Sequence, residues 1–316
     1  MAVTLSNPPY SFVEIYNPRT IVDDCMEYIP LCLPVKGQLD LSFQIIASVT
    51  GSDKDWFNQN STSGEDTFKS TVWARICSEC GNIDPEEPNI NTSFSWSGVW
   101  RKIETGGTDI WIGNFTGTLN PARFNALTVG ECFKICFYRV QYNIEDVTTL
   151  TGVTTTLIGC TETCFVKITD ECYTSRFTYG CNEDTNGFIY TDESGNINFT
   201  NAVRLPCYLR NMQLPSSEKS YVKSSGAKTK LYERTDEEYD LVIDYMPSQW
   251  HKNMKVLLGS DNTQIQNVNS SGNTYWPFVN NEKYDIGLPD EDYPNKPATT
   301  KIVRSEALSL INSNCK

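Results

Sequence analysis

Short stretches of alternating apolar and polar residues recur along the chain, with clusters of turn-forming residues between them. In 39–45 every second residue is apolar, which predicts a strand with one buried side and one solvent-facing side. In a second predicted strand, Phe133, Ile135 and Phe137 share one side. Short strands of this kind, broken by turns about every ten residues, are typical of sandwiches and barrels.

Two β-hairpins are predicted from the order of these strands. Segments 219–223 and 228–233 flank the turn Ser224-Ser225-Gly226 and form the first hairpin. Segments 131–141 and 157–168 form the second if the Thr-rich stretch between them is its tip.

One short amphipathic helix is expected near 247–258. Pro247 can occupy its first turn, where the missing N–H costs nothing. Trp250, Met254 and Leu258 follow at i, i+4 and i+8, so they share one apolar face. The predicted solvent-facing side consists of Lys252, Asn253 and Lys255.

Length and composition favour two domains and an all-β class. The 316 residues exceed the size at which one core usually stops growing. Asn, Asp, Gly and Thr crowd together in the middle of the chain, which marks a boundary. We therefore predict two β-sandwich or jelly-roll-like domains: an N-terminal domain over 1–170, a loop-rich junction over 171–200, and a C-terminal domain with the helix over 201–316.

The charge balance argues against two classes of partner. With 39 acidic and 26 basic residues the formal charge is −13, and such a chain repels phosphate backbones and anionic lipids. We therefore expect no nucleic-acid partner and no membrane partner. No apolar run reaches 18 residues, and the first residues lack the basic start and apolar stretch of a signal peptide, so export is not expected.

Twelve cysteines need an explanation in a chain without an export signal. Their density is well below that of a disulfide scaffold, in which roughly one residue in ten is Cys. Cys is also among the most buried residue types when it is reduced. We expect mainly reduced, buried thiols and no cofactor.

Six of these cysteines have a spacing that leaves other interpretations open. One pair is a lone Cys-x-x-Cys, and a structural zinc would need two more ligands. The other four lie at i and i+4 on the two arms of the second predicted hairpin, so they occupy facing positions. These thiols could be buried, paired as disulfides or gathered around a metal. The weak zinc candidates are Cys77, Cys80, Cys132, Cys136, Cys160 and Cys164.

Catalytic constellations are not evident. His251 is the single histidine, and it lies in the predicted helix with no Gly-x-Ser-x-Gly elbow to supply a nucleophile. We therefore interpret it as a solvated histidine on a helix face. The clustered carboxylates, which could serve a hydrolase or bind calcium, are interpreted as solvated turn residues. These clusters are Asp184, Asp192 and Glu193 in the middle and Asp290, Glu291 and Asp292 near the end.

Aromatic residues offer one further binding hypothesis. Trp96, Trp100 and Trp111 could form a sugar-stacking platform on a sandwich. Their alternation with apolar neighbours favours a place in the core instead.

The second half also carries short motifs that resemble virion proteins of tailed phages infecting Bacteroidota, including the crAss-like phages. The resemblance covers roughly 205–270, with short matches at 40–44 and 312–315. The motifs are Arg204-Leu205-Pro206, Glu218-Lys219-Ser220-Tyr221-Val222-Lys223-Ser224-Ser225-Gly226, Glu237-Glu238-Tyr239-Asp240-Leu241, and Asp244-Tyr245-Met246-Pro247 before the Trp/His helix.

What the resemblance implies is a structural role in a virion tail, neck or baseplate. Such proteins have β-sandwich domains and form symmetric rings or trimers, and the family offers no catalytic residues to carry over. The expected partners are copies of the chain itself and other virion proteins, with a host-surface glycan as a further candidate. The expected location is the virion, assembled in the host bacterial cytoplasm.

The function predicted from the sequence is therefore a non-enzymatic structural component of a bacteriophage virion. The alternative is a carbohydrate- or receptor-binding β-sandwich module on a virion or a cell surface. A hydrolase with paired carboxylates is the third hypothesis.

Overall fold

A computed structural model of the 316-residue chain divides it into two compact units, which we describe separately. Unit 1 comprises residues 1–170 and 182–204, and unit 2 comprises 171–181 and 205–316. The predicted junction 171–200 thus has its first part in unit 2 and its remainder in unit 1. The structure describes residues 2–16, 32–37, 40–50, 68–78, 94–95, 101–105, 108–116, 118–119, 125–143, 154–169, 173–192, 194–266, 275–280, 284–286, 296–304 and 309–312.

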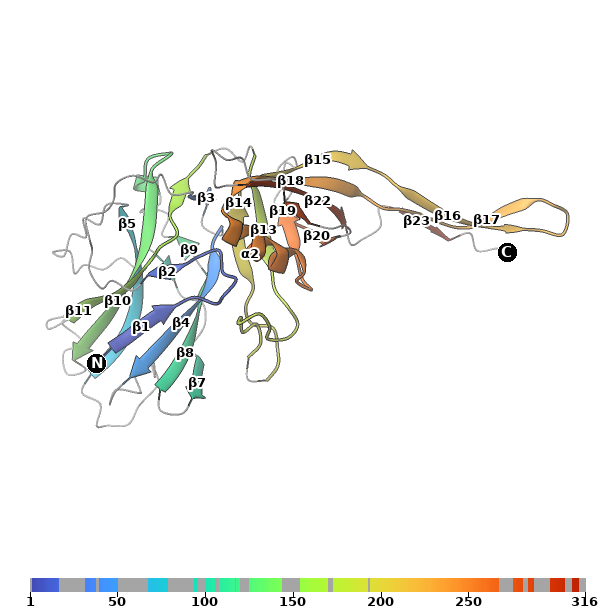
Figure 1. The fold of residues 1–316 in the computed structure, drawn as a ribbon. Helices are drawn as coiled ribbons and strands as arrows, with labels where there is room; N and C mark the ends of the chain where they lie inside the picture. Colours follow the sequence, from blue (N-terminus) through green and yellow to red (C-terminus); the bar gives the residue numbers. More distant parts are fainter. Residues whose placement is uncertain are drawn as a thin grey trace. The chain divides into compact units, whose positions relative to one another are not determined.

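The all-β class predicted from the alternation is confirmed (Figure 1). Antiparallel strands make up most of the described residues, and the single helix whose bounds they give is α2 (Ser248–Leu258). The sandwich or jelly-roll detail of that expectation stays a prediction.

Unit 1 contains two main sheets. In one, the strand order is β14-β4-β8-β7, with β1 paired to β4 on a further stretch of its length. In the other sheet β10 is central, with β5 paired along one side and β11 and β12 paired along the other. Beyond them, β2 pairs with β11, and β3 pairs with β12. The strands are β1 (Ala2–Ser6), β2 (Ile15–Tyr16), β3 (Leu33–Val35), β4 (Ser42–Thr50), β5 (Phe68–Ser78), β6 (Phe94–Ser95), β7 (Arg101–Thr105), β8 (Thr108–Thr116), β9 (Thr118–Leu119), β10 (Cys132–Asn143), β11 (Thr154–Thr161), β12 (Phe165–Lys167) and β14 (Asn201–Leu205).

The core of unit 1 is aromatic, and its two sheets meet at a glycine. Phe43 and Phe115 stack across β4 and β8 with ring centroids 4.5 Å apart. Leu5 of β1 packs on Gly159 of β11, where an added Cβ would lie 2.9 Å from the Leu5 Cδ1 atom. A larger residue at 159 would therefore have to displace the Leu5 side chain.

The prediction that one side of strand 39–45 faces solvent is wrong. Asp40, Ser42 and Gln44 are buried together with their apolar neighbours. The reason is that 182–204 covers this face and supplies polar partners. Gln44 donates from Nε2 to the Ile189 carbonyl at 2.6 Å and accepts from the Ile189 N–H at 2.9 Å.

The larger sheet described in unit 2 is antiparallel and has the order β15-β18-β22-β20-β19-β13, with β21 paired to β22 as well. Leu241 and Ile243 belong to β18, which lies between β15 and β22, and both are fully buried. The strands are β13 (Ser175–Tyr179), β15 (Cys207–Gln213), β16 (Ser216–Val222), β17 (Lys228–Thr235), β18 (Glu238–Met246), β19 (Gln264–Gln266), β20 (Tyr275–Asn280), β21 (Asp285–Ile286), β22 (Lys296–Arg304) and β23 (Ser309–Asn312).

The helix α2 matches its predicted span closely, with Pro247 as the residue before its first turn. Trp250, Met254 and Leu258 are buried, as the i, i+4, i+8 spacing predicts. Asn253 was predicted to face solvent and is instead buried, so the apolar stripe is wider than predicted.

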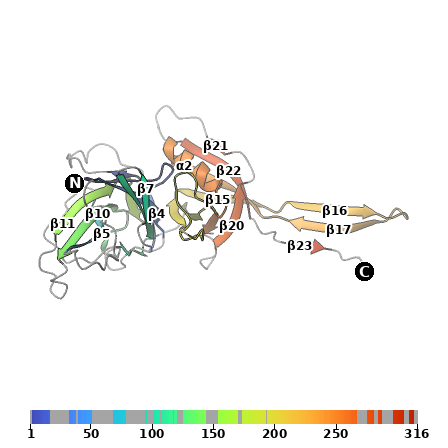
Figure 2. The same ribbon diagram turned by 90° about the horizontal axis from the view of Figure 1, so that it is seen from below.

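The predicted hairpin over 219–233 is confirmed as β16 and β17, joined by a tight turn. The Gly226 N–H donates to the Lys223 carbonyl at 2.8 Å, and Gly226 has a φ of +80°, which glycine adopts at little cost. With β23 these strands form a separate three-stranded sheet in the order β16-β17-β23. Figures 1 and 2 show β16 and β17 running side by side as a ribbon beyond the ends of β15 and β18.

Candidate functional site

The two arms of the second predicted hairpin pair as expected, and they bring two of the candidate thiols together. Cys136 of β10 lies directly opposite Cys160 of β11, and their Sγ atoms are 2.8 Å apart. The hydrogen bond with Cys136, helped by the charge of Lys134, lowers the pKa of the Cys160 thiol. Cys160 is the more exposed thiol of the pair and is therefore the more reactive one.

Cys132 and Cys164 do not face one another across β10 and β11; they meet through a third cysteine that the sequence interpretation missed. The Cys32 Sγ atom lies 3.0 Å from the Cys132 Sγ atom. A hydrogen bond with Cys164, followed by burial, raises the pKa of the Cys32 thiol. Cys32 directly precedes β3, the apolar strand 33–35 at the edge of this sheet. The sequence signal for this strand was the apolar run Leu31-Cys32-Leu33-Pro34-Val35, which could have pointed to Cys32.

These thiols do not assemble a metal centre in the part of the chain that the structure describes. No group of three or more His, Cys, Asp or Glu there could hold a metal ion. Cys77 belongs to β5, but its side chain and all of Cys80 lie outside the described residues. The seven cysteines that are described are thiols: Cys32, Cys132, Cys136, Cys160, Cys164, Cys181 and Cys207.

His251 was predicted to be solvated, and that prediction is wrong. It is 1% exposed, and its Nδ1 atom lies 2.7 Å from the Tyr284 hydroxyl oxygen. Burial raises the pKa of Tyr284, with the charge of Cys207 adding to the effect, so the hydroxyl stays protonated and can donate to His251. A histidine with so little exposed surface has no direct access to a substrate, and its role here is to satisfy a buried polar contact.

The mid-chain carboxylates that were candidates for calcium or catalysis are used to hold turns. Asp184 Oδ1 accepts hydrogen bonds from the Tyr190 and Thr191 N–H groups and from the Thr191 hydroxyl. Asp192 Oδ1 accepts from the Ser194 and Asn196 N–H groups, both at 2.8 Å. Bonds of this kind fix local backbone geometry. Glu193 and residues 290–292 lie outside the described residues.

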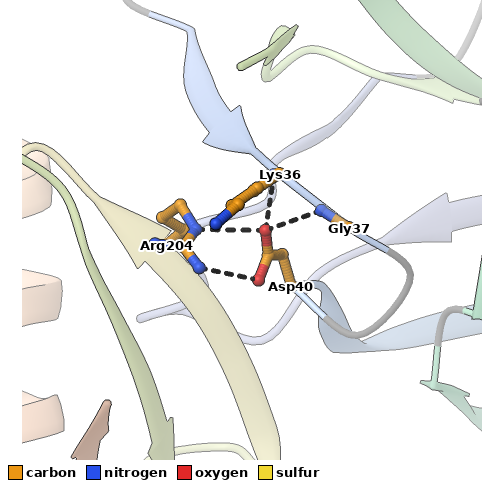
Figure 3. Close-up of polar contacts among 4 residues, drawn as sticks. All are labelled: Lys36, Gly37, Asp40 and Arg204. Carbon is orange, nitrogen blue, oxygen red and sulfur yellow. Dashed lines mark hydrogen bonds and ion pairs between the residues drawn. The ribbon is translucent and has the colours of Figure 1, made fainter. Parts of the chain in front are cut away.

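A buried ion pair anchors the same segment of unit 1 (Figure 3). Arg204 Nε lies 3.0 Å from Asp40 Oδ2, and Arg204 Nη2 lies 3.2 Å from Oδ1, so the contact is bidentate. Asp40 Oδ2 also accepts from the N–H groups of Lys36 and Gly37. The pair joins Asp40, which lies between β3 and β4, to Arg204 of β14, and it is a structural contact.

Of the three tryptophans of the sugar-stacking hypothesis, the structure describes one, and that one is buried. Trp111 is buried in β8, as the alternation favoured, and is not available on a surface. Trp96 and Trp100 lie outside the described residues.

The feature that stands apart is a β-ribbon of unit 2 in which residues 210–228 are exposed. We call residues 210–235 the arm: the outer end of β15, all of β16, the turn, and β17. Every residue from 210 to 228 is exposed, which includes Met212, Leu214, Tyr221 and Val222. A ribbon of this kind has no core of its own, and isolated hairpins are marginally stable in water.

The charge of the arm is opposite to that of the chain as a whole. The arm has six basic and two acidic residues, a formal charge of +4 in a chain of −13. Unit 1 has 24 acidic and 12 basic residues, a formal charge of −12. The hairpin was predicted from the sequence, but its exposure was not. The signal was present in β16, where Tyr221 and Val222 are the only apolar residues.

The fold thus defines an all-β protein of two units with an exposed, basic β-ribbon. No protein-family model, curated protein or solved structure matches the chain. Among the described residues, no helix has the length and apolar character needed to cross a membrane.

Proposed function

We propose that this protein is a non-enzymatic structural subunit of a bacteriophage virion, in the tail, neck or baseplate, that works through contacts in a symmetric oligomer. The observation that carries the proposal is the arm, in which a run of residues from 210 to 228 is exposed throughout. The motifs that resemble virion proteins of Bacteroidota phages support the virion as the setting, and the longest of them, 218–226, lies within the arm.

An exposed ribbon gains stability when it docks on a partner. Ordering the backbone costs about 1–2 kcal/mol per residue, and a segment that buries nothing recovers little of that cost within its own chain. Large apolar side chains at Met212, Leu214 and Tyr221 remain in water. Docking on another surface would bury them and supply the missing stabilisation. This is the behaviour of an assembly element rather than of an enzyme scaffold.

The test is electron microscopy of the purified full-length chain in negative stain. The proposal predicts closed particles whose class averages have rotational symmetry. A monomer that binds glycans in a glycan-array experiment would contradict it and favour the receptor-binding alternative. The genes that flank the coding sequence give a second test, because portal or tail genes are expected beside it.

A further inference from the structure

We propose that the arm of one copy docks on unit 1 of a second copy, with electrostatic attraction orienting the contact. This inference rests on the proposed function, because it names the partner through which the oligomer forms. It is carried by three properties of the arm: its charge, the apolar residues near its tip, and its outer strand.

Charge complementarity selects the acceptor. The arm is at +4 and unit 1 is at −12, whereas unit 2 outside the arm has 13 acidic and 8 basic residues, a formal charge of −5. Unit 1 therefore has the larger negative formal charge of the two units that a second copy offers. Opposite charges speed the encounter of two surfaces and fix their orientation.

The end of the arm has the composition of a docking tip. Tyr221 and Val222 are 55% and 53% exposed, and Val222 lies opposite Lys228 across the hairpin. Lys223 and Lys228 are exposed at either side of the turn. An aromatic anchor beside cationic residues suits an acidic surface with an apolar centre, and tyrosine is enriched among the residues that dominate binding energy.

The outer strand offers the backbone for the same contact. In the order β16-β17-β23, β17 pairs with both neighbours while β16 is the terminal strand. A terminal strand can add to the edge of another sheet through main-chain hydrogen bonds. Docking of one arm on a different surface of the next copy is a head-to-tail contact, which closes into a ring when the rotation permits.

Nucleic acid is the competing occupant for a basic hairpin, and the overall charge of the chain disfavours it. A duplex approaching the arm would also meet the field of the remaining residues, which sum to −17. Each copy of the chain has both a basic arm and an acidic unit 1. Every copy that joins the assembly therefore adds one favourable contact. The second copy is therefore the occupant to which we commit.

The experiment compares two charge reversals in the full-length chain by sedimentation velocity over a range of concentrations. K223E/K228E changes the arm, and K252E/K255E changes two exposed lysines of α2 by the same total charge. The inference predicts that the arm variant dissociates at concentrations at least about tenfold higher than wild type does, a loss of about 1.4 kcal/mol. The α2 variant should dissociate as wild type does.

A second variant tests the apolar tip, in case charge reversal alone changes assembly too little to measure. Y221S/V222S removes the apolar tip without changing charge and should also weaken assembly by about tenfold or more. An oligomer that withstands both arm variants would overturn the inference and leave the proposed function intact. Wild type that stays monomeric at every concentration would overturn both. Binding of duplex DNA that K223E/K228E abolishes, with assembly unchanged, would identify nucleic acid as the occupant and overturn the inference.

Discussion

Asp40 and Arg204 lie 164 residues apart in the sequence and form a bidentate ion pair that is almost completely buried in unit 1. Their side chains are 6% and 2% exposed. The pair closes 182–204 over β4, so the polar face of that strand is covered rather than solvated.

Arg204→Met tests this pair while keeping much of the aliphatic packing of the arginine. The change leaves the Asp40 carboxylate buried without its cation, and breaking such a pair costs about 3–5 kcal/mol. Denaturant unfolding measures the loss. The control Arg210→Met removes an exposed arginine and should cost little. A loss below about 1 kcal/mol in R204M, as for a surface pair, would contradict this role.

Tyr284→Phe tests the burial of His251. The substitution removes the hydroxyl group 2.7 Å from His251 Nδ1, and a lost hydrogen bond to a buried polar atom costs about 1–3 kcal/mol. Thermal or denaturant unfolding detects this change. Tyr221→Phe removes a hydroxyl from an exposed tyrosine and is the matched control. Equal stability of Y284F and wild type is the result expected if His251 were solvated, and it would refute the buried contact.

Oxidised glutathione should link Cys136 to Cys160. The Cys160 thiolate attacks one sulfur of the glutathione disulfide and releases one glutathione; Cys136 then attacks the mixed disulfide and releases the second. Directly opposed antiparallel residues have Cα atoms about 4.5–5.5 Å apart, within the range that a disulfide spans. Peptide mass mapping should find the linked pair, and Cys160→Ser should abolish it. Glutathione retained on Cys160 with no closure would contradict the prediction.

Glu14 makes unit 1 less stable as the pH rises. Burial, and secondly repulsion from Glu162, raise the pKa of Glu14 in the folded chain. The contribution of Glu14 to the free energy of unfolding is therefore fully present below the unfolded pKa of about 4.3. It is lost as the pH rises through the folded pKa. Glu14→Gln should raise the melting temperature by about 1–2 °C at neutral pH, a modest shift because the group is partly exposed.

The same Glu14→Gln gain should vanish at about pH 3, where the glutamate is protonated in both the folded and the unfolded state. Glu183→Gln, at an exposed site of unit 1, serves as the control and should change little at either pH. A gain in E14Q that is equal at acid and neutral pH would show that charge is not its cause.

Alternation predicted the β class, a Ser-Ser-Gly turn predicted the hairpin of β16 and β17, and i, i+4, i+8 spacing predicted the helix α2. The pairing of β10 with β11 was predicted on the condition that the Thr-rich stretch is a hairpin tip. Alternation gave the wrong exposure for polar residues that are buried and hydrogen-bonded within the protein. Gln44 is fully buried because Ile189, 145 residues away, supplies both an acceptor and a donor. A local pattern contains no information about such distant partners.

The candidate sites were predictable to a similar extent. Facing positions for Cys136 and Cys160 follow from strand spacing, because both lie on one hairpin. Cys32 directly precedes β3 and lies 100 residues before Cys132, so no local spacing could reveal the contact between these two thiols. The exposure of the arm depends on the absence of any element packed over 210–228 among the described residues, which only the folded chain can show.

The mass of the chain in solution shows whether its copies assemble. Size-exclusion chromatography with multi-angle light scattering on the purified full-length protein should give one discrete species whose mass is an integer multiple of 35.7 kDa. That species should shift toward smaller masses when the ionic strength rises from about 0.1 M to about 1 M, because the Debye length falls from about 10 Å to about 3 Å. A mass of 35.7 kDa at every concentration and salt would contradict the account.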